Sequence, residues 1–211
     1  MKLSSEPVRP KRLAWILLLL CAAVIPPLSA QTRLTLEQAQ SRTGPDYVPT
    51  YEGKDVVVAG QISARPILIT DSYYLPIQDE AQYGLLLQGT EARFRNLEPG
   101  DWIEAEGTIL RRGGRPALAP KDIRRQGHTD PPRPRPSRPD ELASFRYLGV
   151  LVSTEGIVTD LNQNTGGDLL LVGRKQNSLS VFLPRVRRNA GPQLAGFRVG
   201  DRIQVVGIAN Q

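Results

Sequence analysis

Six aromatic and arginine side chains in the first half of the chain have the chemistry to hold a ligand. They are Tyr73, Tyr74, Tyr83, Trp102, Arg111 and Arg112. Aromatic rings stack on the flat faces of bases and sugars, and guanidinium groups pair with anions. The same tyrosines and tryptophan also suit half-buried β-strands, where they would contribute packing alone. We take the six residues as candidates for ligand binding and leave a purely structural role open as the alternative.

Residues suited to catalysis or metal binding are sparse. Cys21 is the only cysteine and His128 the only histidine, which excludes disulfides, Cys/His zinc sites and a Cys–His or Ser–His pair within a folded domain. Glu104 and Glu106 alternate with apolar residues, which predicts a solvated strand face and not a catalytic carboxylate pair. No glycine-rich phosphate loop connects a strand to a helix. We expect no catalytic residue, no metal site, no cofactor and no enzymatic activity in these residues.

The element that would position the candidates is a turn and strand that occurs twice. Residues 97–109 begin with the turn formers Pro-Gly-Asp and continue with alternating apolar and polar residues, as in a strand with one buried face. Residues 197–207 repeat the pattern Gly-Asp-x-Ile-x-x-x-Gly, and residues 152–158 resemble 56–62 at a nearly equal offset. Two similar offsets indicate a duplicated domain. We expect the two copies to superpose with their flanking strands in register.

The first copy, residues 53–126, predicts a small β-barrel. Strands are expected at 54–63, at 66–70 with 74–78, and at 84–88, 101–110 and 116–125, with a helical turn at 91–97. A glycine inside a strand usually marks a bend, so Gly60 and its counterpart Gly156 are predicted at bends of the first strands. Five short strands with a helical insert before the fourth are typical of an OB-fold barrel. The predicted fold class is all-β, with two tandem OB-fold-like five-stranded barrels.

The second copy differs from the first at its end. Residues 127–139 are rich in proline and arginine, which favours an extended spacer that would include His128. Residues 140–211 then form the second domain, whose fourth strand ends near Ala209, where a fifth strand should begin. The second barrel is therefore expected to be incomplete at its C-terminus. Either the sequence is a fragment of a longer protein or a partner fills the gap.

Residues 1–30 have the features of a signal peptide or membrane anchor. Basic residues precede an apolar run over residues 13–25, which is short for a membrane span. Residues 31–52 follow as a short capping helix with its lead-in, marked by a capping box of Thr35 and Gln38. This start predicts an exported chain, periplasmic or membrane-associated and facing the periplasm. The membrane is a partner if the segment stays uncleaved.

The net charge gives only a weak case for nucleic acid as a partner. The formal net charge is +6, and residues 1–30 carry +3 of it through four basic residues against one acidic residue. The rest of the chain therefore carries about +3, which is too little to indicate a polyanion-binding surface.

The order of these parts resembles the extracytoplasmic region of certain bacterial sensor histidine kinases and diguanylate cyclases. The parts are an export signal, a short helix, an OB-like unit with Leu-Glu-Pro-Gly-Asp-Trp-Ile-Glu-Ala-Glu-Gly, a Pro/Arg linker, Asp-Glu-Leu and a second such unit, over residues 34–211. The resemblance implies a non-enzymatic sensory or interaction module with an unknown ligand or protein partner, and a kinase or cyclase domain later in a longer chain. The alternative is an exported OB-fold binding protein for single-stranded nucleic acid or oligosaccharide.

Overall fold

The computed structural model describes residues 32–174, 177–185 and 194–210. The predictions for residues 1–30 lie outside these ranges. Residues 31–211 form one compact unit. Within the described ranges, no helix is long and apolar enough to cross a membrane. Strands dominate the structure and form two larger sheets and one small hairpin.

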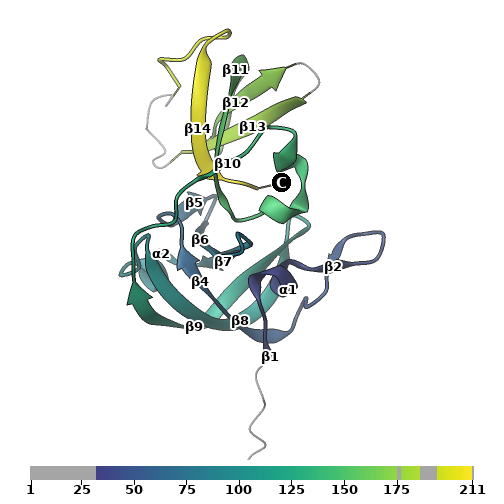
Figure 1. Cartoon of the computed structure of the whole chain (residues 1–211), viewed down its shortest axis with the longest axis vertical. Coiled ribbons are helices and arrows are strands. Elements are labelled where there is room, and N and C mark those ends of the chain that lie inside the picture. The colour runs from purple at the N-terminus through teal and green to yellow at the C-terminus, as the bar shows by residue number, and fades with distance from the viewer. Residues whose placement is uncertain (1–31, 175–176, 186–193, 211) are drawn as a thin grey trace, which may run out of the picture. The chain divides into compact units, whose positions relative to one another are not determined.

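Five strands close into a first barrel (Figure 1). They are β4 (Asp55–Ile62), β6 (Ser72–Gln78), β7 (Gly84–Gly89), β8 (Asp101–Arg112) and β9 (Arg115–His128). Around the ring the strands pair in the order β4-β6-β7-β9-β8 and back to β4. In this ring the β7–β9 pairing is parallel and the others are antiparallel. This arrangement, with helix α2 (Glu91–Phe94) between β7 and β8, is an OB-like fold.

The barrel core follows the alternation in the sequence. The inward residues of β8 are at most 1% exposed: Ile103, Ala105 and Ile109. Glu104 and Glu106 lie on the opposite, half-exposed face, as predicted. Helix α1 (Leu36–Gln40) packs against this core, and its predicted capping box is present. The remaining short strands of this part are β1 (Thr32–Arg33), β2 (Arg42–Thr43), β3 (Val48–Pro49) and β5 (Ile67–Ile69).

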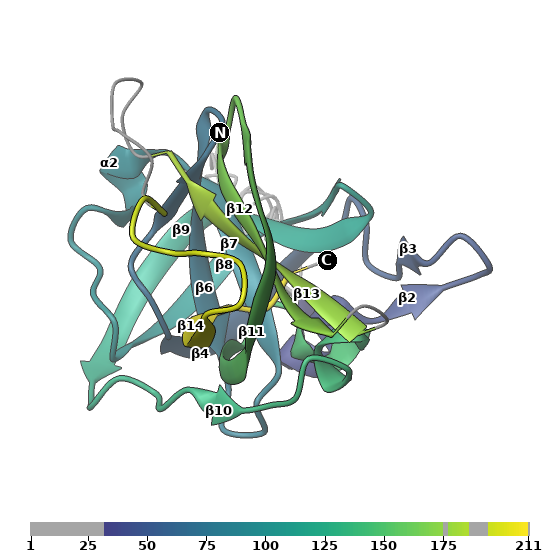
Figure 2. The same ribbon diagram turned by 90° about the horizontal axis from the view of Figure 1, so that it is seen from above.

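A second sheet repeats four of the five strands (Figure 2). Its elements are β10 (Arg135–Pro136), the 3-10 turns η1 (Glu141–Ala143) and η2 (Phe145–Tyr147), β11 (Leu151–Asn164), β12 (Gly167–Arg174), β13 (Asn177–Pro184) and β14 (Arg202–Ile208). The strand β11 pairs with β12 and β14, and β12 pairs with β13. These pairings match those of β4 with β6 and β8, and of β6 with β7. The short parallel strands β1 and β10 also correspond, because each pairs with the first long strand of its sheet.

The turn before the fourth strand has the same geometry in both sheets. Gly100 and Gly200 adopt φ of 99° and 100°, where glycine is favoured. Two residues earlier, a backbone N–H donates to the aspartate that follows the glycine, at 3.0 Å in the first turn and 2.8 Å in the second. Ile103 lies opposite Gly60, and Ile203 lies opposite Gly156. The predicted common register is therefore confirmed.

Gly60 and Gly156 lie where each first strand changes partner. Strand β4 pairs with β8 through Gln61 and with β6 from Gln61 onward. Strand β11 pairs with β14 up to residue 157 and with β12 from residue 158. A Cβ on Gly60 would lie 3.2 Å from the Gln78 carbonyl oxygen, and one on Gly156 would lie 2.6 Å from Val172 Cγ1. A side chain would therefore be tight at Gly60 and would clash at Gly156, as expected where the strands cross from one partner to the other.

The predicted spacer at residues 127–139 is partly wrong. Strand β9 continues to His128, which pairs with Asp101 of β8. Within the same segment, β10 pairs in parallel with β11. Backbone hydrogen bonding therefore ties both ends of the segment to the two sheets, and composition alone gave no indication of this.

Candidate binding site

The predicted binding residues do not converge on one groove. Trp102 lies near the start of β8 and Arg111 and Arg112 at its end, about 30 Å apart along the strand. Tyr73 and Tyr74 are neighbours in β6 and therefore point to opposite faces of the sheet. The candidates must be considered in separate groups.

Tyr74 and Arg112 come together near the turn between β8 and β9. Tyr74 lies opposite Gln88 in the β6–β7 pairing, and Arg112 Nε donates to Gln88 Oε1 at 2.6 Å. Arg115 lies close to Tyr74. Burial lowers the pKa of Arg115, and the Tyr74 phenol acts in the opposite direction. Arg111 is exposed on the same turn. We call Tyr74, Gln88, Arg112 and Arg115 the Tyr74 group. Of the predicted set it contains Tyr74 and Arg112, whereas Arg111, the neighbour of Arg112 in β8, points to the opposite face of the strand.

Tyr73 and Tyr83 are held by contacts within the protein. Tyr73 packs against the barrel core, and burial together with Glu91 raises its pKa. The Tyr83 hydroxyl donates to Glu37, and the guanidinium of Arg146 lies 4.1 Å from the centre of the Tyr83 ring. The hydrogen bond to Glu37, followed by burial, raises the pKa of Tyr83. For these two residues the structure supports the packing role that the sequence left open.

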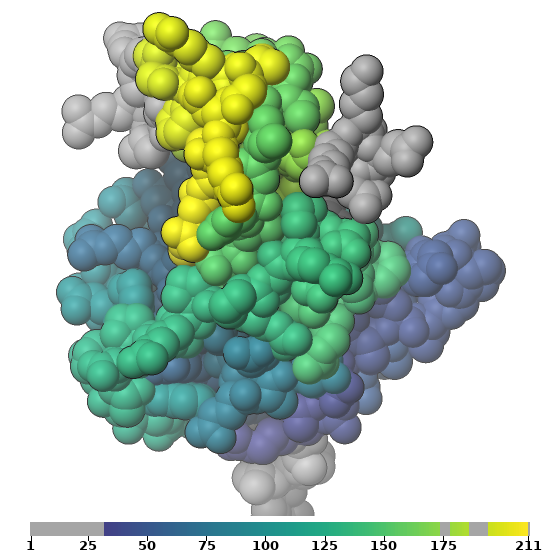
Figure 3. All heavy atoms as spheres, turned by 45° about the horizontal axis from the view of Figure 1, so that its top comes forward, coloured from purple at the N-terminus to yellow at the C-terminus, as the bar shows by residue number. Residues whose placement is uncertain are grey.

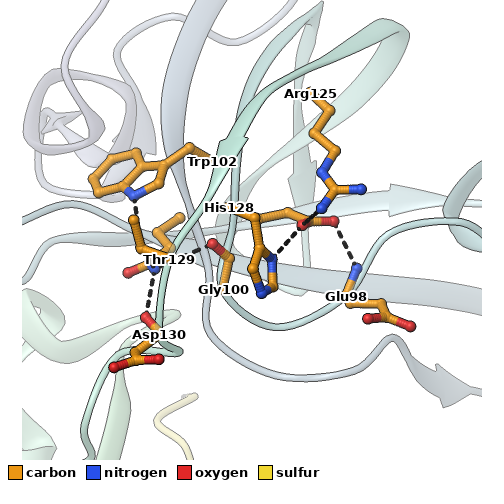
Figure 4. Close-up of polar contacts among 9 residues, drawn as sticks. Glu98, Gly100, Trp102, Arg125, His128, Thr129 and Asp130 are labelled. Atoms are coloured by element: carbon orange, nitrogen blue, oxygen red, sulfur yellow. Dashed lines mark hydrogen bonds and ion pairs between the residues drawn. The ribbon is translucent and has the colours of Figure 1, made fainter.

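Trp102 belongs to a polar network at the rim of the barrel (Figure 4). Its indole N–H donates to Thr129 Oγ1 at 3.2 Å. Gln61 Nε2 also donates to Thr129 Oγ1, at 2.7 Å, and to the Asp130 carbonyl oxygen at 2.8 Å. The Thr129 N–H donates to the Gly100 carbonyl at 3.0 Å. Trp102 therefore fixes the chain that leaves β9, and its ring nitrogen is not free for a ligand.

Beside Trp102 lies a cluster of charged residues that the sequence analysis missed. The Asp101 carboxylate is fully covered, with His128 Nδ1 at 2.7 Å and an Arg125 guanidinium nitrogen at 2.8 Å. It also accepts the Glu98 N–H at 3.0 Å. Burial opposes ionisation, but the Glu98 N–H, His128 and Arg125 together lower the pKa of Asp101. We call Asp101, Arg125 and His128 the rim cluster.

The rim cluster contains an Asp–His pair, as many hydrolytic sites do. Catalysis by such a pair needs a hydroxyl or thiol nucleophile bonded to the second ring nitrogen. In the described part of the chain, no hydroxyl or thiol forms a hydrogen bond with His128. No group of three or more metal-ligating side chains occurs in that part either. The cluster holds the end of β9 against the start of β8.

The chain itself covers part of the face on which OB barrels bind ligands. That face lies over the second and third strands, here β6 and β7. The Leu151 N–H donates to Gln78 Oε1 at 3.0 Å, across from β11 to β6. Gln40 Nε2 donates to the Leu148 carbonyl at 2.5 Å and also to the Gly84 carbonyl. Leu148 and Leu151 are therefore bonded beside the end of β6 and the start of β7, directly at Gln78 and through Gln40 at Gly84.

Two glycines allow this cover to lie directly on the backbone of β7. A Cβ on Gly84 would lie 2.4 Å from the carbonyl carbon of Gly149. A Cβ on Gly149, which has a φ of 75°, would lie 2.8 Å from the Leu85 nitrogen. The cavity that remains at this contact has a volume of about 10 Å³, the space of a single water molecule. A base or a sugar ring therefore has no room over this part of β7.

Arg42 makes the neighbouring corner of the barrel electropositive. Its guanidinium lies 4.0 Å from the centre of the Phe145 ring. Arg42 Nε and Nη2 are buried and have no hydrogen-bond partner among the residues that the structure describes. Burial, followed by the charge of Arg115, lowers the pKa of Arg42. Within the described residues these two nitrogens have no acceptor, a position that an anion would fill, and the charge of Arg115 acts on the same corner.

Comparisons with known proteins gave structural neighbours only. No family model and no curated protein matches the sequence. The structure of OBody AM1L10 bound to hen egg-white lysozyme is 16% identical with a TM-score of 0.34, over 43% of this chain and 94% of that chain. The hypothetical protein YgiW from E. coli is 20% identical with a TM-score of 0.32, over 44% and 89%. The S. pombe Stn1–Ten1 complex is 15% identical with a TM-score of 0.39, over 46% and 79%.

Proposed function

We propose that this chain is a non-enzymatic interaction module that acts outside the cytoplasm. In this proposal it is the N-terminal part of a bacterial sensor histidine kinase or a similar signalling protein. The observation that carries the proposal is the cover over β6 and β7. Because Leu151 bonds to the last residue of β6, and Gln40 joins Leu148 to the first residue of β7, part of the face that an OB barrel offers to bases and sugars serves the protein's own packing.

Export and domain division are part of the same proposal. The basic and apolar sequence of residues 1–30 supports export to the periplasm, with or without cleavage. The shared register and shared turn geometry support a duplication with units at 53–126 and 140–211, joined by residues 127–139. A sensory module of this kind would take a protein partner or a small ligand through surfaces other than the covered face.

The alternative function is binding of single-stranded nucleic acid or oligosaccharide. The Tyr74 group and the Arg42 guanidinium, two of whose nitrogens lack an acceptor among the described residues, favour it, because they combine an aromatic ring with cationic groups at one edge of the covered face. In this alternative, Tyr74 would stack on the ligand and Arg112 would pair with a phosphate or another anion.

Titration of the full chain with a fluorescent thymidine oligonucleotide and with a labelled oligosaccharide distinguishes the two functions. At a salt concentration of about 0.15 M we expect no binding tighter than about 10 µM, the range of non-specific contacts. Submicromolar binding that Tyr74→Ala and Arg112→Ala weaken, and that Trp102→Ala leaves unchanged, would reject the interaction-module proposal. Trp102→Ala is the matched aromatic control, since it lies at the other end of β8.

A further inference from the structure

Two arginines flank the turn between β8 and β9 and lie on the same face of the hairpin. Arg112 pairs opposite Arg115 across a turn in which Gly113 and Gly114 adopt φ of 55° and 79°. The side chains of directly opposite residues are neighbours, and like charges at such positions destabilise a strand pair. Arg115 Nε also donates to the Arg112 carbonyl at 3.3 Å, which holds the Arg115 side chain beside the turn. The hairpin therefore places two cations together at its end.

A third arginine adds positive charge to this corner from another element. Arg42 belongs to the β2–β3 hairpin, which forms the blue protrusion in the space-filling view (Figure 3). The hairpin lies beside the end of β8, because β3 packs against β8 and β9 and the Gly53 N–H donates to the Ile109 carbonyl at 2.8 Å. Burial and the charge of Arg115 both lower the pKa of Arg42. Arg42 and Arg115 are therefore close enough to repel each other.

Among the described residues, the three arginines form no ion pair with an acid. The ion pairs in this part of the chain use other arginines, Lys121 and His128. Like charges gathered without counter-ions reduce the stability of the fold. Proteins accept such local conflicts mainly at functional sites, where a ligand supplies the missing charge.

The polar groups around Arg112 present donors to a ligand. Gln88 Oε1 accepts from Arg112 Nε at 2.6 Å, and Gln88 Nε2 donates to Ser72 Oγ at 3.0 Å. The Gln88 side chain therefore orients Arg112 and uses its own acceptor on it. Tyr74, opposite Gln88 in the β6–β7 pairing, adds a phenol hydroxyl. A ligand at this corner meets positive charge with N–H and O–H donors, which fits an oxyanion.

The cover beside this corner limits the size of the ligand. Gln40 joins Leu148 to Gly84 at the start of β7, and the cavity that remains there, which Arg115 lines, has room for a single water molecule. A polymer laid across β7 would collide with the cover, whereas a small ligand could approach Arg112, which is exposed. A phosphate group concentrates up to two negative charges and three acceptor oxygens in one small group, and guanidinium groups match its geometry.

We infer that Arg112 and Arg115 bind the phosphate group of a small, soluble ligand, and that Arg42 adds positive charge from the buried side of the same corner. In this site Gln88 orients Arg112, and Tyr74 borders the ligand. The inference rests on the proposed function, since it specifies the chemistry of a small ligand of the interaction module.

Isothermal titration of the full chain with inorganic phosphate and with pyrophosphate tests the inference. The buffer contains chloride at an ionic strength of about 0.15 M, which screens attraction between exposed charges that are not in contact. We expect saturable binding of one ligand per chain, with pyrophosphate the tighter of the two because it carries more charge. Malonate, a small dicarboxylate, should bind more weakly than pyrophosphate, since its charges lie on two separate planar groups.

Arg112→Gln and Arg111→Gln form a matched pair of variants. Each removes one exposed arginine of β8 and changes the net charge equally, but neighbouring strand residues point to opposite faces. Arg112→Gln should weaken pyrophosphate binding at least about tenfold, the effect of losing a hydrogen bond to a charged group, and Arg111→Gln should change it little. Arg112→Lys should also bind more weakly, because lysine keeps the charge without the planar fork. If Arg112→Gln does not fold, hydrogen exchange of the unmodified chain decides the question, since pyrophosphate should slow exchange at residues 111–115.

Four results would overturn the inference. They are the absence of saturable phosphate and pyrophosphate binding, malonate binding as tight as that of pyrophosphate, equal losses in Arg111→Gln and Arg112→Gln, and exchange protection confined to residues outside the turn. Cosedimentation with vesicles of phosphatidylcholine and phosphatidylglycerol, if Arg112→Gln abolishes it, would assign the corner to a lipid headgroup and so also reject a small, soluble ligand.

The oligonucleotide titration separates failure of this inference from failure of the proposed function. Submicromolar oligonucleotide binding that Tyr74→Ala weakens rejects the interaction module itself. Failure to bind phosphate, pyrophosphate and oligonucleotide alike rejects only the phosphate site.

Discussion

Asp101→Asn should destabilise the protein far more than Asp201→Asn. Both aspartates follow the glycine of the same turn and accept the same backbone N–H. Asp101 is fully covered and contacts His128 and Arg125, whereas Asp201 is partly exposed and has no side-chain partner within the described residues. The pair of variants therefore isolates the contribution of the rim cluster from that of the turn.

The size of the effect follows from the contacts that are lost. A hydrogen bond to a charged group contributes about 1.5–3 kcal/mol. Arg125 and His128 are 53% and 47% exposed, so solvent screening places each contact at the lower end of that range. The NH2 group of an Asn side chain would also face one of the three groups that donate to Asp101, which are the Glu98 N–H, His128 and Arg125. We expect Asp101→Asn to lower the free energy of unfolding by about 3 kcal/mol, or the melting temperature by roughly 6–12 °C. Asp201→Asn should cost less than about 1 kcal/mol.

Urea unfolding of both variants at neutral and acid pH measures this difference. The folded pKa of Asp101 lies below its ordinary value, so its stabilisation is present above about pH 4 and disappears as the pH falls further. The gap between the unmodified chain and Asp101→Asn should therefore shrink in acid. Equal losses in the two variants at neutral pH, or a gap that persists at about pH 2, would refute the reasoning.

Two further predictions concern the contact between Gly84 and Gly149 and the hydrogen exchange of the second sheet. Gly84→Ala should lower the melting temperature by several degrees, because its Cβ would lie 2.4 Å from the Gly149 carbonyl carbon. Gly127→Ala, with nothing within 4 Å of the new Cβ, should change it little, and equal shifts would contradict the assigned contact. In hydrogen exchange, residues 147–209 should exchange faster than residues 53–125, since edge strands open more readily. Equal protection of the two ranges in a monomer would contradict this expected difference between the two sheets.

Local features of the fold could be predicted from the sequence. The alternation in β8 fixes which side chains enter the core, and the turn glycine at residue 100 fixes where the strand begins. The bends at Gly60 and Gly156 were predictable because a glycine within an apolar strand pattern usually marks a bend. Because the pattern repeats, the same predictions for the turn, the core-facing residues and the bend applied to the second sheet.

The rim cluster could not be predicted because it depends on register over a long hairpin. The β8–β9 pairing contains two register shifts. Counting pairs back from Arg112 and Arg115 at the turn would place Gln126 opposite Asp101, but the shifts bring His128 there. Local composition assigned His128 to a proline-rich spacer. A bulge shifts pairing by one residue without a strong sequence signal, so the Asp–His contact becomes visible only in the structure.

The candidate ligand residues failed to converge for a related reason. Tyr83 stacks with Arg146, and the Trp102 indole N–H donates to Thr129. Both partners follow β9 in the chain and so lie outside the strands of the first barrel. Such contacts depend on how the later chain packs against the barrel. The sequence analysis placed Tyr74 near the β8–β9 turn because both elements belong to the same small barrel.

The long β8–β9 hairpin also has a consequence for the order of folding. Its strands are joined by a short turn between Arg112 and Arg115, so its pairing requires little loop-closure entropy and can form early. Within the described residues the second sheet shows no corresponding hairpin, and its β11–β14 ladder must close the chain from Ile157 to Arg202. Contacts that distant in sequence form slowly. The first barrel is therefore expected to form first and to provide the surface on which residues 147–151 settle, so the second sheet would be completed last.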